Sequence, residues 1–167
     1  MKKEKEIKLL DDDKLQVQVG EKCFEIQDLP ATGLVVLIEQ AMIKSYDLTK
    51  CYKKATDLGS LARKFTFSGA GFLGLSFLTQ NKIFSLASVF AAMVAIPLYF
   101  VSLYQQKKTA KKIDDNQYLK LVLLSELKFR EIEGREDLTA ANSIILDVIE
   151  KDKIRKEKFE REEGYSV

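Results

Sequence analysis

The chain contains no histidine and no tryptophan, and only two cysteines and two prolines among its 167 residues. Histidine is the usual base beside a nucleophilic side chain and a common zinc ligand, so its absence argues against both kinds of site. Cys23 and Cys51 lie 28 residues apart and belong to no CxxC motif. We therefore expect free thiols in a reducing compartment, no metal, no cofactor and no enzymatic activity.

Charge is nearly absent from residues 65–106, which hold a single charged side chain, Lys82, in a chain that is 31% charged. Residues 65–81 form one uncharged run of 17 residues, and residues 83–106 form another of 24. A bilayer core of roughly 30 Å requires about 20 apolar residues in a helix. The short tip around Lys82 leaves no room for a soluble connection. The sequence therefore predicts a transmembrane helical hairpin over residues 63–106.

Two alternatives to a spanning hairpin remain open. A buried hairpin in a soluble bundle would need polar residues on its outer face, and neither run carries a charged stripe. A re-entrant wedge is also consistent with the sequence, because the first run is short and rich in glycine. The second run carries Pro97, where we expect a kink.

The distribution of basic residues predicts the orientation of the hairpin. No aspartate or glutamate occurs in residues 58–113, and the amino terminus carries charges of both signs without the apolar segment of a signal peptide. Basic residues flank the hairpin on its cytoplasmic side according to the positive-inside rule. We therefore expect an integral membrane protein with two spans and both termini in the cytoplasm. The juxtamembrane basic residues are Arg63, Lys64, Lys107, Lys108, Lys111 and Lys112.

Small residues recur at four-residue spacing in both hydrophobic runs, which is typical of closely packed membrane helices. Such surfaces predict packing within the hairpin and leave an outward face for a homo-oligomer. No ionisable group lies within either run, so any pore would discriminate poorly between ions. The candidate packing residues are Ala70, Gly74, Ser88, Ala91, Ala92 and Ala95.

The segment before the membrane combines strands and a helix. Apolar and polar residues alternate over residues 15–29 around Gly20, which predicts a β-hairpin within residues 1–28. Because two strands alone are marginally stable in water, we expect pairing with residues 7–10 or with a partner chain. The acidic run 11–13 is expected to be a solvated turn. Residues 30–62 predict a cytoplasmic amphipathic helix that could bend at Gly59 into the first span.

The segment after the membrane, residues 110–163, predicts a cytoplasmic helical pair interrupted at Gly134. Apolar residues of the second helix follow heptad spacing, as in a short coiled coil, at Leu138, Ala141, Ile145 and Val148. Beyond residue 149 the charges alternate in sign, which indicates a solvated helix or a fraying tail. Acidic and basic residues are interspersed, so no nucleic-acid partner is expected. The fold class is thus a mainly α membrane protein with a small amino-terminal β-hairpin.

The order of these elements resembles a known family. Ala110, Asn116, Tyr118 and Leu121 follow an A-x5-N-x-Y-x2-L pattern that opens the helix after the second run. With the hairpin and its minimal tip, residues 48–133 look like the SLATT domain of prokaryotic conflict systems. The resemblance implies a two-helix membrane effector that forms pores or perturbs the membrane when a nucleotide signal is sensed elsewhere. The chain departs from the pattern in lacking the Trp and His residues often found around the spans.

Two functional hypotheses follow. In the first, the chain is an oligomeric membrane effector or channel-like pore, in keeping with a role in prokaryotic defence. In the second, it is a membrane-anchored scaffold whose β-hairpin or carboxy-terminal helices bind a protein partner. A secreted bacterial effector inserted into a vacuolar membrane would share the layout of the second hypothesis.

Overall fold

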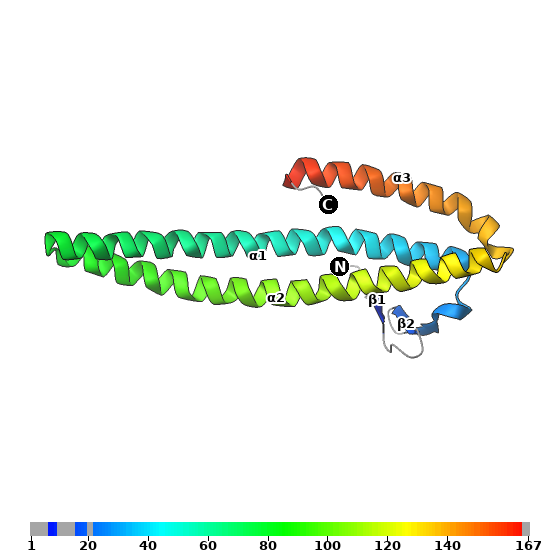
Figure 1. Cartoon of the computed structure of the whole chain (residues 1–167), viewed down its shortest axis with the longest axis horizontal. Coiled ribbons are helices and arrows are strands. Elements are labelled where there is room, and N and C mark those ends of the chain that lie inside the picture. The colour runs from blue at the N-terminus through cyan, green and yellow to red at the C-terminus, as the bar shows by residue number, and fades with distance from the viewer. Residues whose placement is uncertain (1–6, 10–15, 20–21, 165–167) are drawn as a thin grey trace. The chain divides into compact units, whose positions relative to one another are not determined.

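The computed structural model describes residues 7–9, 16–19 and 22–164, and it is mainly helical with a small β-sheet (Figure 1). The acidic run 11–13 lies outside these residues. The elements in chain order are β1 (Ile7–Leu9), β2 (Gln16–Val19), β3 (Lys22–Glu25), the 3-10 helix η1 (Ile26–Asp28), α1 (Ala31–Thr79), α2 (Lys82–Ile132) and α3 (Asp137–Glu163).

The two long helices are continuous where the sequence predicted boundaries. α1 passes through Gly59 without ending, so the predicted cytoplasmic helix and the first hydrophobic run form one helix. α2 likewise continues through Pro97 and past the lysine-rich segment. The predicted segment boundaries after residue 62 and near residue 110 thus fall inside continuous helices. Lysine, arginine and alanine favour helix, and a single glycine lowers helix stability without ending it.

The chain divides into two compact units, and each is described by itself. One unit combines Met1–Asp47 with Ile113–Val167, and the other is Leu48–Lys112. We call them the head unit and the hairpin unit. The head unit holds the sheet, α3 and the adjoining ends of α1 and α2.

The β-sheet of the head unit is antiparallel, with the strand order β1-β2-β3. Ile7 pairs with Val19, and Val17 pairs with Phe24, which confirms the predicted hairpin and its third strand. Val17 and Ile26 are fully buried in a core completed by Leu34, Leu37, Ile38, Leu119 and Leu123. This core explains how so short a sheet persists, since the helices cover one of its faces.

α3 packs through the predicted heptad residues. Ala141 and Val148 are buried with Ala31 and Val35 in a second cluster, and half-buried Leu138 and Ile145 pack against it. Burial of these side chains away from water stabilises the docked helix.

The contacts of α3 continue beyond the apolar residues. The Tyr46 hydroxyl donates to Asp152 Oδ1 at 3.2 Å, and the Tyr46 and Phe159 ring centroids lie 5.4 Å apart. Arg155 Nη2 pairs with Glu39 Oε1 at 2.8 Å. After residue 149, α3 continues to Glu163, and the side chains of residues 150–162 are exposed or half-buried, which agrees with the predicted solvated helix. The polar pairs at these positions were not predicted, because sequence periodicity detects apolar patterns.

Arg130 of α2 is only 1% exposed. Its guanidinium donates to Glu126 Oε1 at 2.8 Å and to three backbone oxygens, those of Ile26 at 3.0 Å, Gln27 at 3.0 Å and Leu29 at 2.5 Å. A buried charge is tolerated when its donors are satisfied in this way. Arg130 therefore holds the segment that joins the sheet to α1.

Asp137 completes this arrangement. Its Oδ2 accepts from the backbone nitrogen of Ala31 at 3.1 Å and lies 3.5 Å from Arg130 Nη1. A carboxylate at a helix start satisfies a free amide and interacts favourably with the helix dipole. One side chain of α3 thus fixes the beginning of α1.

The Tyr46 contact predicts a pH dependence of stability. Burial of the hydroxyl and the nearby negative charge of Asp152 raise the pKa of Tyr46 from 10.0 to about 12. The folded state then binds the phenolic proton more tightly than the unfolded state, so this stabilisation is complete below pH 10 and is lost as the pH rises toward 12. Urea unfolding followed by circular dichroism should show this loss in the parent, and Tyr46→Phe should weaken it. Tyr118→Phe, at a half-exposed ring of the same unit, is the control. Equal pH dependence in all three proteins would contradict the assignment.

Candidate functional site

The hairpin unit turns within two residues. α1 ends at Thr79 and α2 begins at Lys82, which confirms the predicted minimal tip. Gln80 adopts a left-handed backbone conformation with φ of 52°. Asn81 Oδ1 accepts from the backbone nitrogen of Ile83 at 3.0 Å, and so caps the start of α2. The tip is therefore a defined turn with its own side-chain cap.

Small residues form the interface between the two helices of the hairpin unit. A Cβ added at Gly69 would lie 3.2 Å from the Ala91 Cβ, so the backbones approach closely there. Ser88, Ala91 and Ala95 are buried, as close packing of the hairpin requires. Sequence reasoning missed Ala62 and Gly69, which are also buried.

The other predicted packing residues lie on the outer surface. Ala70, Gly74 and Ala92 are exposed, and a Cβ added at Gly74 would meet nothing within 4 Å. Within one chain, the first helix therefore uses Gly69 in place of the predicted Ala70–Gly74 pair. A seven-residue repeat in the sequence distinguishes the inward from the outward small residues. Ala55, Ala62 and Gly69 follow this repeat and are all buried, whereas Ala70 and Gly74 fall outside it and are exposed.

A buried hydroxyl joins the helices at the opposite end of the hairpin unit from the tip. Ser102 is 1% exposed, and its Oγ donates to the Ala55 backbone oxygen at 2.7 Å. Gln106 Nε2 donates to Ser102 Oγ at 3.0 Å and lies 3.4 Å from the same carbonyl. Gly59 faces this group, because a Cβ there would lie 2.7 Å from Ser102 Oγ. The absence of a side chain at Gly59 makes room for the hydrogen bond.

The outer surface of the hairpin unit is apolar over residues 65–106. Large side chains are exposed on both helices, up to 83% for Leu78. Residues 65–106 carry one charge, at Lys82 beside the tip. Exposed apolar surface on this scale marks an interaction site or a membrane-facing surface. The side chains that are more than two-thirds exposed are Phe67, Phe77, Leu78, Ile83, Leu86, Phe90, Met93 and Tyr104.

α2 is the one helix among the described residues whose length and composition suit a membrane span. Its most apolar stretch is 22% buried, whereas the core helix of a soluble protein would be mostly buried. This combination fits membrane association. α1 does not meet the same criterion.

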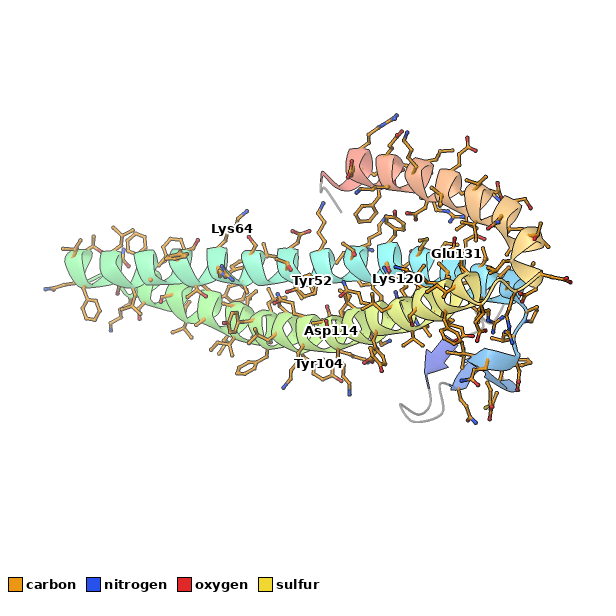
Figure 2. All side chains as sticks on the ribbon, turned by 45° about the vertical axis from the view of Figure 1, so that its right-hand side comes forward. Tyr52, Lys64, Tyr104, Asp114, Lys120 and Glu131 are labelled. Atoms are coloured by element: carbon orange, nitrogen blue, oxygen red, sulfur yellow. The ribbon has the colours of Figure 1, made fainter. Side chains whose placement is uncertain are left out.

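All six juxtamembrane basic side chains are exposed. Figure 2 shows Lys64 and Tyr104 projecting outward from α1 and α2. Lys108 Nζ lies 5.9 Å from the centroid of the Tyr104 ring, within range of a cation–π interaction. Pro97 is also exposed, and the kink expected there stays a prediction.

The described residues contain no group of three His, Cys, Asp or Glu side chains placed to hold a metal. Cys23 and Cys51 are exposed and free. A shallow depression of about 530 Å³ in the head unit is lined by residues 27–30, Arg130 and residues 135–137. The guanidinium there is already bonded to protein oxygens, so the depression offers a ligand little of its charge.

The Gly59–Ser102 contact predicts that Ser102→Ala restores part of the stability lost in Gly59→Ala. Gly59→Ala should displace the Ser102 hydroxyl and destabilise the hairpin by about 1–3 kcal/mol. Ser102→Ala alone should remove two hydrogen bonds, one to the Ala55 oxygen and one from Gln106, each worth about 1 kcal/mol. The double variant should be more stable than Gly59→Ala, because a Cβ at position 59 lies 3.6 Å from the Ser102 Cβ, an ordinary contact.

Thermal unfolding of the purified chain in detergent measures this coupling. Gly71→Ala is the matched control, since a Cβ there meets nothing within 4 Å. Strictly additive effects of the two substitutions would show that the side chains do not interact.

Comparison with known proteins adds no relative on which a function could rest. The chain matches no protein-family model, no curated protein and no solved structure. Any functional proposal for this chain therefore depends on its own sequence and geometry.

Proposed function

We propose that the chain is an integral membrane protein whose hairpin unit spans the bilayer twice, with both termini in the cytoplasm, and which acts as an oligomeric membrane effector or channel-like pore. The observation that carries this proposal is the hairpin surface, which exposes large apolar side chains on both helices.

The two-residue tip supports a second span in α1. If α2 crosses the bilayer from its first turn, Gln80 and Asn81 are too few to return the chain through a layer of roughly 30 Å. Residues 65–79 must then cross back as part of α1. These residues are uncharged, and their backbone hydrogen bonds are satisfied within the helix, as a lipid environment requires.

The outward small residues support self-association. Ala70, Gly71 and Gly74 are exposed, and neither glycine has a neighbour within 4 Å of an added Cβ. Phe67 and Leu78, at 78% and 83% exposed, lie above and below them along the helix. Small residues allow backbones to approach where lipid supplies no hydrophobic drive, so this face suits the hairpin of a second copy.

The lining available to a pore predicts its selectivity. No ionisable side chain occurs in residues 65–79 or 83–106, so serine, threonine, glycine and backbone groups would have to line it. Charged rings or ordered carbonyls provide selectivity in channels. A pore built from this hairpin would therefore conduct ions with little discrimination. The SLATT-like order of elements is consistent with such an effector.

A scaffold remains the second candidate, and the head unit supplies the observation in its favour. Leu121 and Ile132 of α2 are 65% and 77% exposed, on the side of the helix away from buried Leu119 and Leu123. An apolar face on an otherwise completed unit suits docking of a partner protein. In this alternative the hairpin is an anchor, whether in the cell's own membrane or in a vacuolar membrane reached by secretion.

The topology is tested by labelling the tip. In a chain with Cys23 and Cys51 replaced by serine, Asn81→Cys should react with an impermeant maleimide added outside intact cells, because the tip crosses to the far side. Ser143→Cys, on the exposed side of α3, should react only after permeabilisation. Labelling of position 81 only from the cytoplasmic side would favour the re-entrant wedge.

Measuring the membrane potential of expressing cells distinguishes the effector from the scaffold. Induced expression of the full chain should depolarise cells with little ion selectivity. Gly74→Leu should reduce the effect, because a bulky side chain holds neighbouring hairpins apart, whereas Leu75→Ala should change it less. An intact potential at high membrane levels of the parent, with any trigger supplied, would favour the scaffold.

A further inference from the structure

The small net charge of the chain conceals a strong separation of charge between its two units. The hairpin unit, Leu48–Lys112, holds ten of the 27 basic residues and one of the 25 acidic residues, which gives it a charge of +9. The remaining 17 basic and 24 acidic residues give the head unit a charge of −7. Positive charge therefore accumulates on the unit with the apolar surface.

Within the hairpin unit, four lysines of α2 occupy one face of the helix. Lys107, Lys108, Lys111 and Lys112 follow the i, i+1, i+4, i+5 pattern, so they lie side by side over two turns. All four are exposed, whereas Ser102 is buried and Gln106 and Thr109 are half-buried on the opposite face. Arg63 and Lys64 are exposed on α1 just before its uncharged run. We call these six residues the basic collar.

The charge of the collar is not balanced by ion pairs within the part of the chain that the structure describes. None of the six side chains forms a salt bridge among the residues that the structure describes. Lys107 and Lys111, and likewise Lys108 and Lys112, are like-charged pairs at i,i+4, which repel each other in an isolated helix. An external anion would relieve this repulsion.

Aromatic side chains mark the depth at which that anion would lie. Tyr104 is 67% exposed, one turn from Lys108, whose Nζ lies 5.9 Å from the ring centroid (Figure 2 labels Tyr104). Tyr99 is half-exposed one turn further into the apolar stretch. Tyrosine is enriched where the hydrocarbon core meets the headgroups. Apolar surface, tyrosines and lysines thus follow one another along α2 in the order of hydrocarbon, interface and headgroup.

We propose that the basic collar binds the headgroups of anionic phospholipids. This inference rests on the membrane-spanning hairpin proposed above and adds the class of lipid that it selects. Clusters of four to eight basic residues directly beside a membrane helix attract anionic lipid, each contributing about fivefold in affinity. The negative head unit is repelled by the same surface, so anionic lipid holds the collar at the membrane and disfavours adsorption of the head unit.

The test measures which lipid gathers around the collar. Cys51 is exposed in the hairpin unit, 12 residues before Arg63, or about 18 Å along the helix. The full chain, with Cys23→Ser and a donor dye on Cys51, is reconstituted in phosphatidylcholine vesicles. These contain a trace of acyl-labelled acceptor, either phosphatidylglycerol or phosphatidylcholine. Energy transfer to the phosphatidylglycerol acceptor should be larger, and the difference should shrink as salt screens the charges.

Matched variants assign the preference to the collar. Lys108→Gln should lower the preference for anionic lipid about fivefold, and glutamine at all four α2 lysines should lower it further. Arginine at the same four positions should preserve it. Glutamine at Lys120, Lys128, Lys153 and Lys156 of the head unit removes the same charge elsewhere and should leave the preference unchanged.

Two failures of the experiment are distinguishable. If the chain floats with the vesicles and transfers energy equally to both lipids, the collar does not select anionic headgroups, and this inference is overturned while the membrane proposal stands. The same conclusion follows if the head-unit variant loses the preference as fully as the collar variant. If the chain does not float with vesicles of either composition, the spanning hairpin is wrong and this inference falls with it.

Discussion

Hydrogen bonds from buried side chains of α2 to backbone oxygens earlier in the chain fix how the chain folds back on itself. The buried polar residues of α2 recur every fourteen residues, at Ser88, Ser102, Asn116 and Arg130. The last three donate to the oxygens of Ala55, Ala41 and Gln27, which are also fourteen residues apart. Fourteen residues are two heptads, so each donor meets its acceptor only in this antiparallel register. A shift in register would leave each of these buried groups without a hydrogen-bond partner, and each would lower the stability of the fold by about 1–3 kcal/mol.

The same seven-residue repeat on α1 provides the packing surface in both units, but the side chains that pack differ. In the head unit the repeat on α1 includes Leu34, whose burial with Leu123 and Val17 removes apolar surface from water. In the hairpin unit it passes through Ala55 and Ala62 to Gly69, where close backbone approach replaces large side chains. In the proposed membrane location of the hairpin, lipid gives helices no hydrophobic reason to associate, so small residues and van der Waals contact suit the hairpin, and larger residues suit the head.

The charges and exposed surfaces assign different tasks to the two units. The head unit pairs polar side chains with one another and with backbone groups, through Arg130 and Asp137 at one end and through the Tyr46 and Arg155 contacts along α3. The hairpin unit exposes an apolar surface over residues 65–106, and the six side chains of its basic collar form no salt bridge among the described residues. An effector and an anchored scaffold both require this division, and they differ in whether neighbouring hairpins assemble.

The sequence by itself determined the elements that depend on local pattern. Uncharged runs on either side of Lys82 predicted the hairpin and its tip, alternation around Gly20 predicted the strands, and the residues from Leu138 to Val148 predicted how α3 packs. Only the tertiary structure decided which small residues face inward, because Gly69 and Gly74 are equivalent until the helices pair in one register. It also decided that Arg130 is a buried anchor, since its acceptors are backbone oxygens about a hundred residues away, and backbone oxygens carry no sequence signature.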